Sequence, residues 1–273
     1  MEFLLGKPVA EIIKNRVKEK IATLKRNPRY VVLLNKEDES SLGYARSQER
    51  LAREVGIEFS IIEVEPSEEA YISLIDKVNN DDEIDGVLIT RPLFKGANEK
   101  KILSCLDYRK DVDAINPYSL GKMFMDDAFL VPATAEAVIE MLKYYNIDLV
   151  GKKVLVVGRS LSVGKSAAML LLKENATVTI AHSKSKNFEK EYEDSDIVVA
   201  AVGRKELLDS SEMNENCVVI DCGIHYTDEG IFGDVKVSDK VKYISKVPGG
   251  IGPITSALLM EHVLKCYMEK NND

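Results

Sequence analysis

One segment, Val154–Lys184, limits the fold of this chain more than any other. In it a short apolar run ends at Gly158, a helical pattern begins at Gly164, and a second apolar run follows at Ala176–Ala181. A buried strand that turns at glycine into a helix gathers free backbone N–H groups and the positive end of the helix dipole, where a phosphate can bind. The segment therefore predicts the first half of a dinucleotide-binding fold.

The residues after the second apolar run favour NADP over NAD. An NAD site has Asp or Glu about twenty residues after the glycine turn, where the carboxylate binds the ribose hydroxyls. This chain has cations and hydroxyls there instead, and these suit a 2′-phosphate. An ordinary α/β turn with charged surface residues is the alternative interpretation. The residues predicted to bind the cofactor are Gly158, Arg159, Ser160, Val163, Gly164, His182, Ser183 and Lys184.

The same glycines also resemble a P-loop, since Gly164 is followed by lysine and serine. Val218–Asp221 would then pass for the acidic strand that holds magnesium. A P-loop has four residues between its glycines, however, and this chain has five, Arg159 to Val163. Because each amide of the loop must point at a particular phosphate oxygen, the extra residue makes an NTPase the less favoured alternative.

Length and charge exclude several classes of protein. The 273 residues suffice for one large or two modest domains, and the net charge of −8 argues against nucleic acid as a general partner. Apolar runs such as Ile197–Val202 are too short to cross a membrane, and the N-terminus lacks the pattern of a signal peptide. We therefore expect a cytoplasmic protein with no membrane partner. The four cysteines and three histidines form no metal-binding pattern, so no metal site is predicted.

Strand and helix patterns alternate along the chain, which predicts an α/β fold with parallel sheets covered by helices. A polar stretch, Asp107–Asn116, leads to a hinge predicted at Pro117, and Thr134 is the expected N-cap of a helix that ends at Tyr145. The other predicted helices are Pro8–Arg26, Ser41–Val55, Ser67–Val78, Glu99–Leu106 and Thr255–Lys270. The predicted strands are Tyr30–Leu34, Phe59–Val64 and Gly86–Thr90, with others near Val154, Thr177, Ile197 and Val218.

Five groups of residues, in the same order and over nearly the whole chain, carry a family resemblance. They are Tyr44 and Gln48 with Glu54–Ile57; Lys110–Asp113; Gly158–Ser160 with Val163 and Gly164; Ala176–Thr179 with His182–Lys184; and Pro248–Thr255. Together they resemble the methylenetetrahydrofolate dehydrogenase/cyclohydrolases. This family oxidises 5,10-methylenetetrahydrofolate with NAD(P) and then hydrolyses the methenyl product to 10-formyltetrahydrofolate.

The resemblance implies two lobes with a cleft between them. The N-terminal α/β lobe, 1–117 plus 254–273, would bind folate, and the Rossmann-like lobe with its parallel sheet, 118–253, would bind NADP. One-carbon derivatives of tetrahydrofolate would be the substrates, and the protein would be a homodimer.

The family also implies roles for particular residues. Tyr44 would border the folate ring and Asp113 would bind the pterin edge. Arg159 and Ser183 would hold the 2′-phosphate, with the backbone of Ser160–Gly164 near the other phosphates. Gly249, Gly250 and Pro253 would shape the folate pocket. The expected catalytic positions are Tyr44, Gln48, Thr90 and Asp113.

The chain departs from the family pattern at the catalytic positions. Gln48 occupies the place of the family's catalytic lysine, and Thr90 occupies the place of the glutamine that accompanies it. The family's Gln-Leu-Pro-Leu-Pro segment becomes Thr90–Phe94, with Arg91 in second place. The family's Pro-Cys-Thr-Pro entry to the mid-chain helix becomes Pro132–Ala135.

These departures affect one activity more than the other. The folate nitrogens stabilise the cation left by hydride loss, so positioning carries most of the oxidation and no protein base is needed. Hydrolysis requires a base for water, which contributes about 10²–10⁴-fold. Glutamine and threonine cannot supply it, and Lys95 is the one nearby amine to consider. The sequence therefore predicts a dehydrogenase with weak or absent cyclohydrolase activity. The alternatives are a fully bifunctional enzyme and a non-catalytic NADP- or folate-binding protein.

Overall fold

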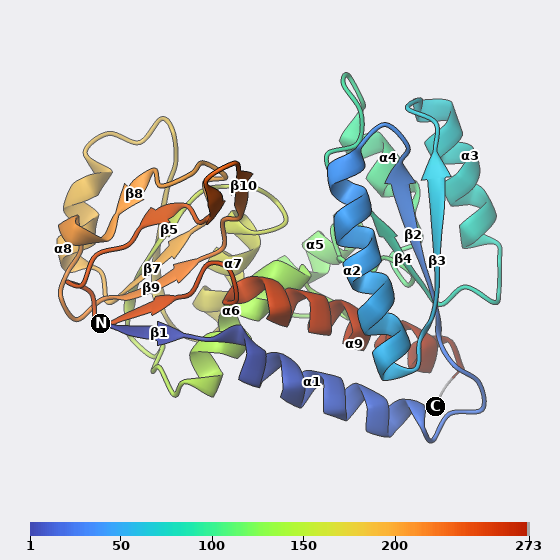
Figure 1. The fold of residues 1–273 in the computed structure, drawn as a ribbon, viewed down its shortest axis with the longest axis horizontal. Helices are drawn as coiled ribbons and strands as arrows, with labels where there is room; N and C mark the ends of the chain where they lie inside the picture. Colours follow the sequence, from blue (N-terminus) through green and yellow to red (C-terminus); the bar gives the residue numbers. More distant parts are fainter. Residues whose placement is uncertain (272–273) are drawn as a thin grey trace. The chain divides into compact units, whose positions relative to one another are not determined.

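The computed structural model describes residues 1–271, which form two compact units (Figure 1). Unit 1 contains Met1–Glu11 and Pro132–Thr255, and unit 2 contains Ile12–Val131 and the chain from Ser256 onward. The domain limits expected from the family resemblance, 1–117 plus 254–273 and 118–253, stay a prediction, as does the cleft. Of the described residues, none belongs to a helix that is both long and apolar enough to cross a bilayer.

Unit 1 is built on a parallel sheet of six strands in the order β1-β13-β9-β7-β5-β6. The strands are β1 (Glu2–Leu4), β5 (Lys153–Val157), β6 (Thr177–Ala181), β7 (Ile197–Ala200), β9 (Val218–Asp221) and β13 (Tyr243–Ser245). Chain order reverses at β5, which has β6 on one side and β7 on the other. The carboxyl end of β5 is therefore the topological switch point, the place where open α/β sheets bind ligands.

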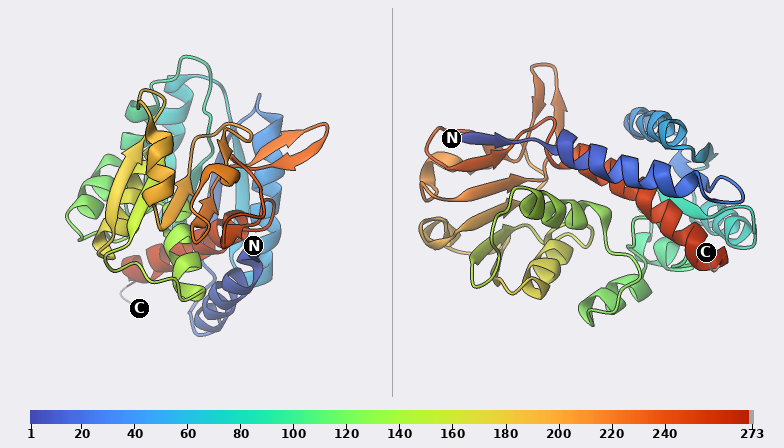
Figure 2. Two further views of the ribbon diagram at one scale, coloured as in Figure 1. Left: turned by 90° about the vertical axis from the view of Figure 1, so that its left-hand side faces the viewer. Right: turned by 90° about the horizontal axis from the view of Figure 1, so that it is seen from below.

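Short elements complete unit 1. Its helices are α6 (Ala133–Tyr144), α7 (Gly164–Lys173) and α8 (Glu191–Asp194), with single 3₁₀ turns at Phe188–Lys190 and Ser210–Glu212. Strand β8 (Leu208–Asp209) pairs in parallel with β12 (Val235–Lys236). The antiparallel hairpin of β10 (His225–Thr227) and β11 (Gly230–Phe232) stands out from the rest of unit 1 (Figure 2).

Unit 2 is built on a parallel sheet of three strands in the order β3-β2-β4. These are β2 (Arg29–Asn35), β3 (Glu58–Val64) and β4 (Gly86–Ile89), and the helices of this unit are α2 (Glu39–Val55), α3 (Glu68–Asn79), α4 (Glu99–Cys105) and α5 (Pro117–Phe124). Successive side chains of a strand point to opposite faces. Val31 and Leu33 of β2 share a core with Ile75 of α3, whereas Tyr30 faces the other way and its ring meets that of Phe59.

Two long helices have residues in both units: α1 (Gly6–Ile21) and α9 (Ile251–Asn271). Within unit 2 they are joined by an ion pair between Arg16 and Glu261. Gly86 of β4 lies so close to α9 that an added Cβ would be 3.0 Å from Val263 Cγ2 and 2.6 Å from Val112 Cγ1. This close approach explains a glycine at the start of a buried strand.

The structure confirms the predicted α/β alternation and changes some boundaries. Thr134 is not an N-cap, because α6 begins at Ala133 and Pro132 holds the cap position without a side-chain bond. A helix begins at Pro117, capped by Asn116, whose side chain accepts the Tyr118 N–H at 2.7 Å, and the hinge predicted there stays a prediction. Helix α9 begins at Ile251, four residues before the predicted start.

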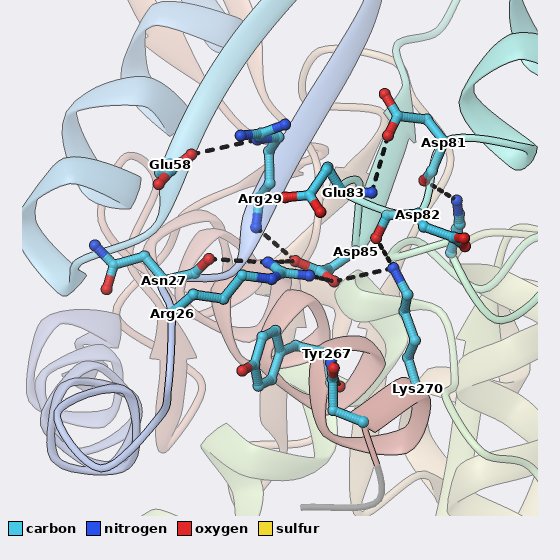
Figure 3. A network of polar contacts seen from close by, with 12 residues as sticks. Arg26, Asn27, Arg29, Glu58, Asp81, Asp82, Glu83, Asp85, Tyr267 and Lys270 are labelled. Carbon is cyan, nitrogen blue, oxygen red and sulfur yellow. Dashed lines mark hydrogen bonds and ion pairs between the residues drawn. The ribbon is translucent and has the colours of Figure 1, made fainter.

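Asp85, which immediately precedes β4, is the centre of a polar network in unit 2 (Figure 3). Its buried carboxylate accepts two bonds from the Arg26 guanidinium, at 2.7 and 2.8 Å, and one from the Arg29 N–H at 2.8 Å. Lys270 Nζ lies 3.8 Å away, and Arg26 also lies over the Tyr267 ring. The network thus ties the starts of β2 and β4 to the last turns of α9.

Lys110, the first residue of the Lys-Asp-Val-Asp segment, caps a helix. Its Nζ donates to the carbonyl oxygens of Val78 at 2.8 Å, Asn79 at 3.0 Å and Asp81 at 2.7 Å, all at the end of α3. Burial lowers the pKa of Lys110, although acidic neighbours oppose the shift. A cation that binds the last carbonyls of a helix also complements the helix dipole, so this lysine stabilises the fold.

Candidate functional site

The turn after β5 requires glycine at two positions. Gly158 has φ of +128°, and a Cβ there would lie 2.0 Å from the Ala201 carbonyl oxygen. A Cβ on Gly164 would lie 2.4 Å from the carbonyl oxygen of Gly158. Larger residues would therefore force the strand, the turn and the helix apart. This tight approach places the N-terminus of α7 directly at the switch point.

The loop between the two glycines presents polar groups at the start of α7. Ser160 Oγ accepts the Gly164 N–H at 3.3 Å, and the Ser160 carbonyl accepts the Lys165 N–H at 3.0 Å. Val163 holds the N-cap position without a side-chain bond, and Arg159 is exposed. Backbone N–H groups, a hydroxyl and a cation at the positive end of a ten-residue helix are the groups that phosphates bind.

The segment after β6 forms a compact turn. His182 Nδ1 accepts the Lys184 N–H at 3.1 Å, and the His182 N–H donates to Ser185 Oγ at 3.0 Å. Since Nδ1 accepts, the proton of the neutral ring is on Nε2. Ser183 and Lys184 are exposed. Because β5 and β6 are neighbouring parallel strands, this turn and Arg159 both lie at the carboxyl ends of the strands.

Two buried aspartates at the same edge of the sheet were not among the predicted site residues. Asp234 accepts three backbone N–H bonds from Val202, Gly203 and Arg204, at 2.7–3.0 Å, and its Oδ1 lies 2.8 Å from His225 Nε2. These bonds fix the loop that follows β7.

Asp221, which ends β9, fixes the neighbouring loop. It accepts N–H bonds from Gly223 at 2.8 Å, Asp234 at 3.0 Å and Val235 at 2.9 Å. Burial raises the pKa of Asp221 to about 6. Its carboxylate is thus taken up by backbone N–H groups rather than held for magnesium, which argues against the P-loop alternative.

In unit 2, Tyr44 and Gln48 lie one turn apart on α2. Tyr44 is 41% exposed, whereas Gln48 is fully buried. The Gln48 Nε2 donates to Ser256 Oγ of α9 at 2.9 Å, and within residues 1–271 its Oε1 has no hydrogen-bond partner. An exchange of the amide nitrogen and oxygen would leave the other end without a partner. Since a buried polar atom without a partner is costly, this position is suited to a ligand or a water molecule.

Thr90 is bound to the neighbouring strand. It is buried, its Oγ1 donates to the Leu33 carbonyl oxygen at 3.2 Å, and its N–H donates to the same oxygen at 3.0 Å. The Thr90 hydroxyl hydrogen is thus bound to the backbone of β2.

Asp113 forms an ion pair with Arg91. The Nη2 atom of Arg91 lies 3.0 Å from Asp113 Oδ2, and the two side chains are 29% and 13% exposed. Burial, followed by electrostatic interaction with Tyr44 and Asp113, raises the pKa of the Tyr30 hydroxyl, which has no hydrogen-bond partner within the described residues. The structure therefore brings Tyr30, Tyr44, Arg91 and Asp113 into one small region of unit 2.

The remaining predicted folate residues belong to unit 1. The Gly249 carbonyl accepts the Gly6 N–H at 2.8 Å, and a Cβ on Gly250 would lie 2.6 Å from the Lys246 carbonyl oxygen. Pro253 lies in the first turn of α9. That these three residues share a pocket with Tyr44 and Asp113 stays a prediction.

Asp111, two residues before Asp113, carries a pH-dependent contribution to stability. It is 3% exposed, and burial raises its pKa to about 7, with a further increase from Asp113 that backbone N–H groups oppose. Between the unfolded pKa of 3.8 and the folded pKa of about 7, the Asp111 carboxyl is protonated in the folded protein and ionised in the unfolded chain. Binding of this proton stabilises the folded protein. The stabilisation is complete below the unfolded pKa of 3.8 and is lost as the pH rises through about 7.

We therefore expect Asp111→Asn, which is always neutral, to gain stability relative to the wild type as the pH rises between those values. The difference in the free energy of unfolding between the variant and the wild type should change by at most about 1.4 kcal/mol per pH unit, measured by urea unfolding at several pH values. Asp127→Asn is the control: the Lys122 hydrogen bond lowers the pKa of Asp127, so the difference in the free energy of unfolding from the wild type should stay constant above about pH 3.8 and change only below it, in the opposite direction. A difference for Asp111→Asn that is the same at every pH would contradict the prediction.

The glycine turn at a switch point and a second α/β unit with a polar site define a two-unit nucleotide-binding α/β enzyme. The chain matches the sequence profiles of the tetrahydrofolate dehydrogenase/cyclohydrolase catalytic domain over residues 4–113 and of the NAD(P)-binding domain over residues 132–271. It therefore belongs to the tetrahydrofolate dehydrogenase/cyclohydrolase family. This confirms the family, the fold class and the enzyme class predicted from the sequence, methylenetetrahydrofolate dehydrogenase, and removes the NTPase alternative.

Individual relatives span almost the entire chain. The Bifunctional protein FolD of Thermotoga maritima is 41% identical over 95% of this chain and 96% of its own length. Crystal structures of bifunctional FolD enzymes also share the fold of this chain. That from Campylobacter jejuni has a TM-score of 0.94 at 34% identity, covering 98% of this chain and 99% of its own. That from Trypanosoma brucei, complexed with NADP and an inhibitor, has a TM-score of 0.93 at 27% identity, covering 99% and 98%.

Proposed function

We propose that this protein oxidises 5,10-methylenetetrahydrofolate to 5,10-methenyltetrahydrofolate with NADP, and that it hydrolyses the methenyl product weakly or not at all. The observation that carries the second part is Gln48. It lies buried at the position where the family resemblance places a catalytic lysine, and an amide does not titrate in the range where a base must act.

The surroundings of Gln48 support this proposal. The Thr90 hydroxyl hydrogen is bound to the Leu33 carbonyl, and threonine is a poor base in any case. Arg91 pairs with Asp113, and a guanidinium is not a base in proteins. Lys95, the one amine considered from the sequence, lies six residues after the end of β4 and is exposed to solvent, away from the buried position of Gln48.

The groups at the two predicted binding sites fit their ligands. In unit 1, Arg159, Ser183 and Lys184 are exposed and suit a 2′-phosphate, and the start of α7 suits the other phosphates. When bound, NADP supplies the hydride acceptor. In unit 2, Asp113 is a carboxylate that can accept hydrogen bonds from the pterin edge, and Tyr44 offers an exposed ring to it. Positioning of this kind is what hydride transfer requires.

A paired assay on one preparation tests the proposal. We expect reduction of NADP with methylenetetrahydrofolate, little reduction of NAD, and decay of methenyltetrahydrofolate at the rate of buffer alone. Decay well above the buffer rate would reject the loss of cyclohydrolase activity. Binding of both ligands without any reduction of NADP would instead support the non-catalytic alternative.

One observation favours the fully bifunctional alternative. The unpartnered Oε1 of Gln48 can accept a hydrogen bond from a water molecule and orient it towards a substrate. A water molecule that is oriented but has no base to take its proton lacks most of the about 10²–10⁴-fold contribution of a base. The fully bifunctional enzyme is therefore the second candidate function. The homodimer and the cytoplasmic location are likewise proposals, drawn from the family resemblance and from the sequence.

A further inference from the structure

The ion pair between Arg91 and Asp113 joins two residues that follow strand-like segments on the same side of unit 2. Arg91 comes two residues after β4, and Asp113 comes two residues after Asp111, which pairs with Val87 of that strand. Both side chains are partly buried, and the bond of 3.0 Å between Arg91 Nη2 and Asp113 Oδ2 is well formed. The family segment has leucine at the position of Arg91, so this cation is a departure of this chain.

A guanidinium and the edge of a pterin offer the same pattern of donors. The pterin edge has a ring N–H next to an exocyclic amino group, which is an N–C–N unit with two N–H groups pointing the same way. Arginine offers this fork to a carboxylate as well, and carries a full positive charge. The Asp113 carboxylate can accept either group, and a pterin edge that binds through both oxygens competes with Arg91 for Oδ2.

We propose that Arg91 is a specificity-determining residue that competes with the pterin edge for Asp113. The inference rests on the proposed function, in which Asp113 binds the pterin. A folate molecule must displace Arg91 before its edge can pair with the carboxylate. Binding is then weakened by the fraction of molecules in which the ion pair is formed.

The size of the effect follows from the exposure of the pair. Exposed ion pairs contribute modestly to stability, and this pair is only partly buried. We expect removal of Arg91 to tighten binding by about two- to fivefold. A ligand that lacks the 2-amino group makes less use of Asp113, so its affinity should change less. Arg91 therefore also reduces the difference in affinity between 2-aminopterins and analogues that lack the 2-amino group.

Calorimetric titration with 5-formyltetrahydrofolate, and with an analogue lacking the 2-amino group, tests the proposal. Arg91→Leu restores the family residue, and Arg91→Gln is a second neutral variant in case the first folds poorly. Both should bind 5-formyltetrahydrofolate about two- to fivefold more tightly, with a smaller gain for the analogue. In the dehydrogenase assay KM should fall while kcat is unchanged, because the change acts on ground state and transition state alike.

Arg109→Leu is the matched control, because it removes another arginine–aspartate pair of unit 2, with Asp107, outside the proposed site. It should leave folate affinity unchanged. Unchanged or weaker binding by both Arg91 variants would overturn the inference. Equal tightening by Arg109→Leu would overturn it as well, because a general loss of positive charge would then explain the result.

Asp113→Asn separates failure of this inference from failure of the proposed function. If Asp113→Asn weakens binding while the Arg91 variants leave it unchanged, Asp113 binds the pterin without competition and only the inference fails. If Asp113→Asn leaves binding unchanged, the role of Asp113 fails and the inference fails with it. Circular dichroism and thermal unfolding of each variant establish that it is folded.

Discussion

Gln48→Lys is expected to raise the rate of methenyltetrahydrofolate hydrolysis by about 10²–10⁴-fold, the contribution of a positioned base. Gln48 is fully buried, and burial lowers the pKa of an amine, so a substantial neutral fraction can accept a proton from water. Ser256 Oγ, 2.9 Å from the present amide nitrogen, would be within reach of the new amine. The measurement is the decay of methenyltetrahydrofolate per active site, compared with the dehydrogenase rate of the same sample.

Gln48→Met is the matched control, since it fills a similar volume but has no group that titrates. It should hydrolyse no faster than the wild type. Adding Thr90→Gln to Gln48→Lys restores both family residues and should give the largest rate. A folded Gln48→Lys enzyme that still oxidises methylenetetrahydrofolate but does not gain hydrolysis would show that Gln48 is not what limits this activity.

Arg26→Ala is expected to cost about 3 kcal/mol of the free energy of unfolding. The substitution leaves the fully buried carboxylate of Asp85 without its two guanidinium bonds, and uncompensated buried charges cost about 3–5 kcal/mol. We expect the lower end of that range because Lys270 and the Arg29 N–H remain near the carboxylate. Unfolding in urea, followed by circular dichroism, measures the change.

Arg29→Ala provides a control within the same network (Figure 3). The Arg29 side chain bonds Glu58 at 3.2 Å on the surface, and the two side chains are 39% and 54% exposed. Its loss should cost less than about 1 kcal/mol, because the backbone N–H that binds Asp85 is kept. Equal losses for the two variants would mean that burial of Asp85 does not set the energy of the network.

Local patterns made most of the fold predictable. The segment from β5 to β6 has an apolar strand, two glycines and a helical pattern within about thirty residues, so pattern and structure agree. The strands β1 and β13 were not predicted, because each has three residues and their pairing joins distant parts of the chain. The N-cap prediction for Thr134 rested on its residue type alone, whereas the helix begins one residue earlier, at Ala133, with Pro132 at the cap position.

The candidate site was predictable only where a family segment could be recognised. The placement of Gln48 against Ser256 depends on contact between α2 and α9, which no local pattern reveals. Asp221 and Asp234 were not among the predicted site residues, because Asp221 ends an apolar strand, Asp234 lies in the turn before β12, and their acceptance of backbone N–H groups is visible only in three dimensions. A signal for Arg91 did exist, since a cation replaces an apolar residue of the family segment, but its partner Asp113 is 22 residues away.

The pairing of β1 with β13 has a consequence for the order in which the protein can fold. Glu2 lies opposite Tyr243, so the ribosome makes the two strands of this pair about 240 residues apart. At about 5–20 residues per second, this delay is on the order of 10–50 s. The sheet of unit 1 therefore cannot be completed until β13 has been made, and by then unit 2 has had its three strands for most of that time. The edge strand of unit 1, β1, is made long before its partner and must stay unpaired until β13 is available.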